Sequence, residues 1–178
     1  MGLIGDWRAA RERRRLADGF LRRLLVAPPE ADVSWLARLA GDRRVAEREL
    51  EFAQRALALM VAGRDALDDR TAADVAHAMA PVVESEGRRD VERGRAWVER
   101  RNAYMEAFTV RGLPEPPPVR FARVLLSGAG VPSPSVDAIE RAAEIVQVTR
   151  ARANEALRES FGAASLPDDV RPSAIRPT

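Results

Sequence analysis

The 178-residue sequence contains no lysine and no cysteine, and its single histidine is His77. All 29 basic side chains are therefore arginine. Lysine, cysteine and histidine supply most Schiff bases, thiolate nucleophiles, soft metal ligands and proton shuttles that work near neutral pH. Their scarcity removes most enzymatic chemistry and leaves carboxylates, hydroxyls and a guanidinium charge that does not titrate. We therefore expect a protein without catalytic residues and without a cofactor.

Long apolar runs are also missing. The apolar residues near the N-terminus lead directly into the charged segment 11–15, which leaves no stretch for a signal peptide or a membrane span. Gly2 does not indicate myristoylation, because Asp6 stands where that motif has Ser or Thr. The absence of cysteine excludes disulfides and agrees with a reducing compartment. The sequence thus predicts a cytoplasmic protein without a transmembrane segment.

Charge is abundant but nearly balanced. The 27 acidic residues almost cancel the arginines, and the formal net charge is +2. The high isoelectric point therefore reflects the high pKa of arginine more than a strong positive field. Segment 8–23 is the exception, because its seven arginines are accompanied only by Glu12 and Asp18. Positive charge is thus concentrated near the N-terminus.

The composition favours helices throughout. Alanine, leucine, arginine and glutamate dominate, and glycine and proline lie between periodic segments. A chain of this length can bury about 70% of its unfolded surface in one domain. We therefore predict an all-α fold, a single bundle-like domain of five to seven helices over 1–161, with a flexible, disordered C-terminal tail at 162–178. The proline-rich connector 113–118 is a candidate sub-boundary within the domain.

Helical spacing of apolar residues locates the individual helices. Segment 56–62 is apolar on every side, which predicts that its helix lies at the centre of the bundle. We expect Asp6, Thr71 and Ser135 to lie at helix N-termini, and Pro81 to weaken or end the fourth helix. The expected helices cover 7–26, 34–40, 43–63, a segment that begins at Thr71, 88–110, 120–127 and 136–161.

Inward-facing positions follow from the same spacing. In the fourth helix we expect Val75, Met79 and Val82 to point into the core. The helix over 88–110 carries two neighbouring rows of large side chains, which we expect to form one broad face. These rows are Val91, Val98 and Met105, and Trp97, Tyr104 and Phe108.

The basic N-terminal helix is the first candidate interaction site. Such a helix can bind an acidic groove of a partner protein, an anionic membrane surface or a phosphate backbone. The alternative is an outer helix whose leucines pack on the bundle while its arginines face water. The candidate residues are Arg8, Arg11, Arg13, Arg14, Arg15 and Arg22.

The second candidate interaction site is aromatic. Trp97, Arg101 and Tyr104 stand at positions i, i+4 and i+7, so a guanidinium can stack on the indole. Tryptophan, tyrosine and arginine are also enriched at the hot spots of protein interfaces. The alternative is ordinary core packing with Arg101 at the edge of the core.

Three further patterns are weaker. Segment 71–79 has the rhythm of a first helix in a helix-turn-helix, but the turn that should follow is absent and acidic residues surround it. Asp74 and His77 resemble half of the Glu-x-x-His element of di-iron bundles, yet no second histidine completes it. The aspartates at 65, 68 and 69 lack the glycine and glutamate of a calcium loop. We therefore expect no metal site.

These observations favour a non-enzymatic helical subunit or adaptor that binds another protein or a second copy of itself. The alternative is binding of nucleic acid or of an anionic membrane surface through residues 8–23. An enzyme is the third interpretation, and Asp74 with His77 is its one candidate pair.

Overall fold

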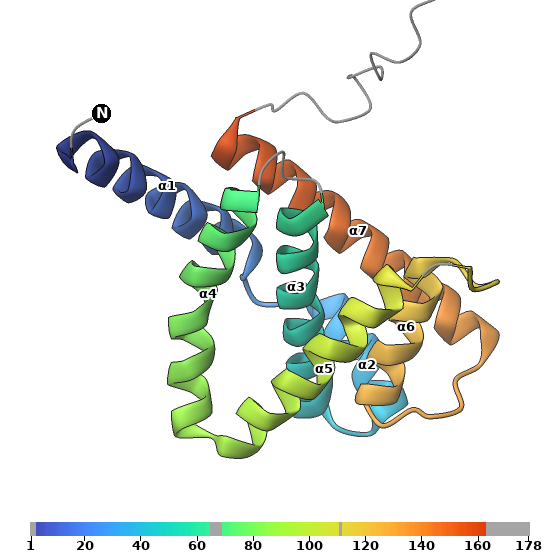
Figure 1. The fold of residues 1–178 in the computed structure, drawn as a ribbon. Coiled ribbons are helices and arrows are strands. Elements are labelled where there is room, and N and C mark those ends of the chain that lie inside the picture. The colour runs from blue at the N-terminus through green and yellow to red at the C-terminus, as the bar shows by residue number, and fades with distance from the viewer. Residues whose placement is uncertain (1–2, 65–68, 111, 163–178) are drawn as a thin grey trace, which may run out of the picture.

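Seven α-helices and no strand make up the described residues 3–64, 69–110 and 112–162 of the computed structural model (Figure 1). The predicted all-α class is confirmed. Except for Gly162, the expected tail 162–178 lies outside the described residues. The helices are α1 (Leu3–Leu24), α2 (Glu30–Ala40), α3 (Arg43–Arg64), α4 (Asp69–Arg89), α5 (Val91–Thr109), α6 (Pro117–Gly128) and α7 (Val136–Phe161).

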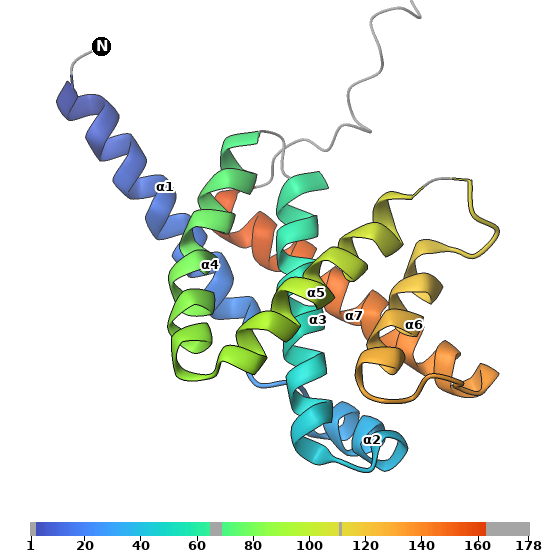
Figure 2. The same ribbon diagram turned by 60° about the horizontal axis from the view of Figure 1, so that its bottom comes forward.

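Helix α3 lies at the centre of the bundle and packs against all six other helices (Figures 1 and 2). Its residues 56–62 are buried except Leu59, which is half-buried. A helix surrounded on all sides needs an apolar surface on all sides. The predicted central position of this segment is therefore confirmed.

The helices on both sides of the proline-rich connector share one apolar core. Helix α6 packs on α5 and α7, and α7 packs on α1 and α3. The connector is shorter than the sequence suggested, because α6 begins at Pro117 instead of Arg120. Prolines are tolerated there, since the first-turn N–H groups of a helix have no intrahelical acceptor.

Two of the three predicted N-terminal caps are wrong. Helix α1 begins at Leu3 and α4 begins at Asp69, so Asp6 and Thr71 lie inside their helices. Ser135 is confirmed, because its side chain accepts a 3.2 Å hydrogen bond from the backbone N–H of Ala138. Asp90 is a cap that the sequence analysis missed. It accepts a 2.9 Å bond from the N–H of Arg93 and opens α5 there, after Arg89 has ended α4.

Pro81 does not end α4, which continues to Arg89. Packing on both sides of the proline holds the helix together, since Val75 and Met79 precede it in the core and Val83 follows it. Val83 takes the inward position that we predicted for Val82, because it continues the four-residue spacing from Val75 and Met79. Val82 is 43% exposed.

The corner between α4 and α5 depends on two glycines. A Cβ atom on Gly94 would lie 2.9 Å from the Cα atom of Gly87, which is closer than real Cβ contacts come. We expect Gly94→Ala to lower the free energy of unfolding by about 1–3 kcal/mol, because the backbone of α4 or of α5 has to shift to make room for the methyl group. Gly19→Ala is the matched control, since nothing lies within 4 Å of its Cβ position. Urea unfolding should show that Gly19→Ala has no cost, and equal effects of both substitutions would contradict the prediction.

Candidate interaction surfaces

Helix α1 is anchored by its C-terminal half, while its N-terminal half extends beyond the bundle (Figures 1 and 2). Ala17, Phe20, Leu21 and Leu24 are buried against the rest of the chain. Trp7, in the extending half, is 61% exposed. The structure thus presents a helix that is fixed at one end and accessible at the other.

The structure separates the six candidate arginines of α1 into two groups. Arg13 is half-buried, and its Nε donates a 3.2 Å hydrogen bond to Oδ2 of Asp74 on α4. The other five are exposed, and none forms an ion pair with another described residue. We call these five the basic face: Arg8, Arg11, Arg14, Arg15 and Arg22.

The basic face is not uniformly positive. Glu12 and Asp18 line the same shallow hollow along α1 as the arginines. Trp7 lies at one end of this hollow, and the Arg11 guanidinium stacks on its ring at 5.6 Å from the centroid. This is a cation–π contact made at the surface. The face therefore combines arginine, an exposed aromatic ring and two interspersed carboxylates.

The aromatic candidates lie in the core. Trp97 is 4% exposed and packs on Phe52 with ring centroids 5.5 Å apart. Tyr104 has no exposed surface and stacks on Phe121 at 4.2 Å. A partner at the surface cannot contact either ring fully without opening the core. This arrangement is the core packing given above as the alternative.

Arg101 is exposed at the edge of this aromatic cluster and does not stack on Trp97. The guanidinium over Trp97 belongs to Arg55 of α3, at 5.9 Å from the ring centroid. A shallow hollow of about 250 Å³ lies between α3, α4 and α5 and is lined in part by Met79, Trp97 and Arg101. It is smaller than the hollow along the basic face and smaller than the one at the proline-rich connector, which Phe108 and Arg120 help to line.

An ion-pair network joins α3, α4 and α5. Arg55 is 7% exposed and donates hydrogen bonds of 2.8 and 2.7 Å to the two carboxylate oxygens of Glu86. Arg93 bridges Glu86, at 3.1 Å, and Glu51. The hydrogen bonds from Arg55 hold the pKa of Glu86 below its ordinary value. The one indication of this network in the sequence is Arg55, a charged residue next to the apolar segment 56–62 of α3.

The one fully buried carboxylate among the described residues lies between α3, α5 and α6. Glu49 has no exposed surface, and its Oε2 accepts a 3.0 Å hydrogen bond from Nε of Arg100. Burial raises the pKa of Glu49, although Arg100 opposes the effect. A substrate cannot contact Glu49 in this fold, because the side chain is completely covered. The cluster is therefore suited to holding helices together and not to acid–base catalysis.

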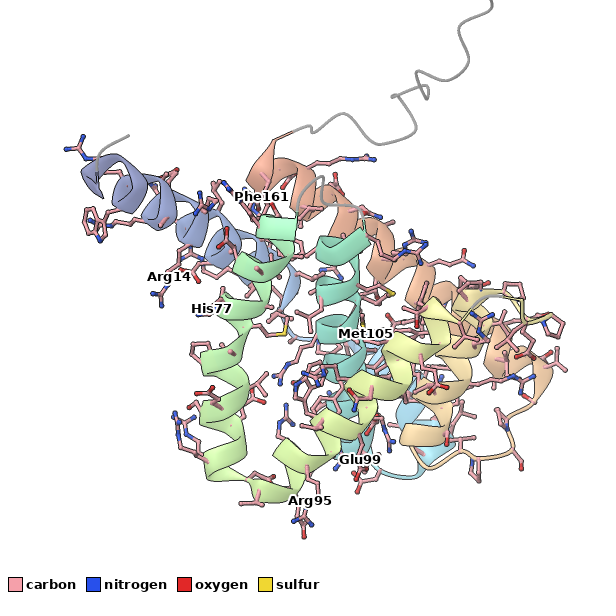
Figure 3. The ribbon with its side chains drawn as sticks, viewed as in Figure 1. Arg14, His77, Arg95, Glu99, Met105 and Phe161 are labelled. Atoms are coloured by element: carbon pink, nitrogen blue, oxygen red, sulfur yellow. The ribbon has the colours of Figure 1, made fainter. Side chains whose placement is uncertain are left out.

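The described residues show neither the side-chain cluster that a metal site needs nor the turn that a helix-turn-helix needs. Within the described ranges, no three His, Asp or Glu side chains lie close enough to hold a metal ion. Asp74 is paired with Arg13, and His77 is exposed on α4 (Figure 3). The positions Asp65 and Asp68 lie outside the described residues. The turn that a helix-turn-helix needs after Met79 is absent, because α4 runs on to Arg89.

None of the seven described helices is both long enough and apolar enough to cross a membrane. Comparison with known proteins adds no information about function, since no family model, no curated protein and no solved structure matches this sequence. The surfaces of this chain are therefore the only source of information about its function.

Proposed function

We propose that this protein is a non-enzymatic helical adaptor or subunit, and that the basic face of α1 docks on an acidic surface of a partner protein. One observation carries the proposal: half of α1 extends from the bundle and exposes Trp7 beside arginines that have no ion-pair partner among the described residues. Tryptophan and arginine are the residue types that contribute most to protein interfaces. The absence of cysteine supports a cytoplasmic setting for it.

The charge pattern of α1 favours a protein partner over a uniform polyanion. Glu12 and Asp18 lie among the arginines of the basic face. A phosphate backbone or an anionic membrane repels these two carboxylates, whereas a protein surface can offer a cation opposite each of them. Mixed charge of this kind fixes the register between two protein surfaces and rejects wrong partners.

A photo-cross-linking experiment tests the proposal. Trp7 is replaced by p-benzoylphenylalanine in the full chain, and cross-links formed in native extract are mapped by mass spectrometry. We expect cross-links to acidic peptides of a protein, because position 7 adjoins the arginines. We expect the yield to fall at least about tenfold in the variant Arg8→Gln, Arg11→Gln, Arg15→Gln and Arg22→Gln, which removes four charges from the contact.

Val148 on α7 gives a matched control position, because it is 61% exposed, as Trp7 is. The photo-reactive residue at position 148 should capture no specific partner. Equal yields at positions 7 and 148 would contradict the proposal. So would cross-links at position 7 that persist unchanged after the four arginines are replaced.

A second candidate function is binding of the basic face to an anionic membrane or to nucleic acid. An exposed tryptophan beside arginines on a helix favours it, because this combination suits a membrane interface. Vesicles that contain phosphatidylserine, and a DNA duplex, are the probes. If this function holds, replacing the four arginines makes the slope of log K for DNA binding against log salt concentration less steep by about 3–4.

The control for this measurement removes the same charge elsewhere. Arg38, Arg44, Arg95 and Arg158 are exposed and form no ion pair within the described part of the chain. Their joint replacement by glutamine should leave a specific contact of α1 unchanged. If both variants lose binding equally, the contact is unspecific attraction to net charge.

A further inference from the structure

The outer side of α5 carries two exposed apolar side chains that no described part of the chain covers. Val91 is 67% exposed and Val98 is 49% exposed, whereas Met105, the next residue of their row, is half-buried and packs against the core. We expected this row to form one broad face with the row of Trp97, Tyr104 and Phe108, and the structure separates the two rows. The row of Trp97, Tyr104 and Phe108 occupies the core, and a single helix cannot bury both rows in this bundle.

An acidic row runs along α5 directly beside the apolar row. Glu92, Glu99 and Glu106 follow one another at seven-residue intervals, so they lie along one side of the helix. All three are exposed, and none forms an ion pair with another described residue. An exposed charged row that flanks exposed apolar side chains is typical of a helix that packs on another helix.

The basic face of α1 has the matching spacing. Arg8, Arg15 and Arg22 also follow one another at seven-residue intervals, and each row covers fifteen residues, a rise of about 21 Å along the helix. The two rows cannot meet within one chain, because α4 lies between α1 and α5 in both views (Figures 1 and 2). Figure 3 shows Arg14 on α1 and Glu99 on α5 on separate parts of the molecule.

The two rows can meet in either relative direction of the two helices. In an antiparallel alignment Arg22 faces Glu92, Arg15 faces Glu99 and Arg8 faces Glu106, and in a parallel alignment Arg8 faces Glu92 and Arg22 faces Glu106. Each direction also brings one or two pairs of arginines together, such as Arg14 and Arg100 in the antiparallel alignment and Arg11 and Arg95 in the parallel one. The charges therefore match the two rows to each other without selecting a direction.

We infer that α1 of one copy docks on the outer face of α5 of a second copy. The inference rests on the proposed function and names its partner. The contact joins two different faces, so it is heterologous and leaves an unoccupied α1 and α5 in each linear dimer. One helix pair of this length is smaller than a standard interface of about 800 Å² per partner, which predicts a weak contact that salt disrupts.

The test measures mass by analytical ultracentrifugation over a range of concentrations at about 50 and 500 mM salt. We expect the mass of the full chain to rise above 19.6 kDa with concentration at low salt only. The basic variant is Arg8→Gln, Arg15→Gln and Arg22→Gln, and the acidic variant is Glu92→Gln, Glu99→Gln and Glu106→Gln. Each alone should associate at least about tenfold more weakly.

Mixing the two variants gives the sharpest result. Each variant supplies the face that the other lacks, so an equimolar mixture should form a one-to-one heterodimer and nothing larger. Circular dichroism verifies that each variant remains helical, as glutamine is a good helix former.

Several outcomes overturn the inference. They are a monomeric parent at all concentrations, a mixture without a heterodimer, or an equal loss in the α7 control variant Asp137→Asn, Glu140→Gln and Glu155→Gln. If the parent is monomeric but position 7 still cross-links to acidic peptides of another protein, only this inference fails. If position 7 also captures nothing, the proposed function fails with it.

Discussion

Replacing Glu86 by alanine is expected to lower the free energy of unfolding by about 3–5 kcal/mol. The carboxylate of Glu86 accepts both hydrogen bonds of Arg55, at 2.8 and 2.7 Å, and Arg55 is only 7% exposed. Removing the carboxylate leaves a guanidinium buried between α3 and α4 without its partner. The cost of such an unpaired buried charge exceeds the value of the pair itself. Urea unfolding followed by circular dichroism at pH 7 measures the effect.

Glu84 provides the control on the same helix. It is exposed, and its oxygen lies 3.9 Å from Arg88 in an (i, i+4) pair. Glu84→Ala should change stability by less than about 1 kcal/mol, because exposed pairs contribute little. The double variant Arg55→Met and Glu86→Leu removes both charges and should recover most of the loss. A similar small effect of Glu84→Ala and Glu86→Ala would contradict the argument.

The same pair gives a pH dependence with a definite sign. Arg55 lowers the pKa of Glu86 below its ordinary value of 4.5, so the folded state binds the proton less tightly than the unfolded state. This contribution is fully present above pH 4.5 and is lost as the pH falls through the lowered pKa. Glu86→Gln should therefore flatten the loss of stability in acid. Burial raises the pKa of Glu49 and gives a contribution of the opposite sign.

The helices themselves were largely predictable because their apolar spacing is strong and local. Helix α7 has the predicted bounds, from its Ser135 cap to Phe161, since cap and periodicity agree there. The errors arose where packing outweighed local preference. Core residues on both sides of Pro81 keep it inside α4. The larger aromatic rings of α5 occupy the core, while Val91 and Val98 face outward.

The surfaces were only partly predictable. The sequence identified the arginines of α1, but it could not show that Arg13 faces Asp74 while its neighbours face outward, because that depends on where α4 lies. Ion pairs such as Arg55 with Glu86 join residues that are distant in the chain. Periodicity along one helix contains no information about which other helix supplies the partner. Local patterns therefore predict helices better than they predict contacts between helices.

Gly128→Ala is the second substitution for which we expect a large effect, a loss of about 2–4 kcal/mol. A Cβ atom at this position would overlap Nε of Arg100 and Oε2 of Glu49, the two atoms that form the hydrogen bond between α5 and α3. Arg100 can turn toward solvent, but Glu49 has no exposed surface and cannot follow it. The buried carboxylate would then keep only the longer contact with Arg48, at 3.4 Å.

A double-mutant cycle separates this mechanism from a general cost of alanine at the end of α6. In a Glu49→Ala background the overlapping carboxylate is absent, so Gly128→Ala should cost at least about 1 kcal/mol less than in the parent. Gly63, near the end of α3, is the matched control, because nothing lies within 4 Å of its Cβ position and its replacement by alanine should not destabilise. Equal costs of Gly128→Ala in both backgrounds would show that the pair of Glu49 and Arg100 is not what the new methyl group disrupts. A smaller cost in the Glu49→Ala background would mean that the missing side chain of Gly128 allows α6 to pack directly against the buried pair of Glu49 and Arg100.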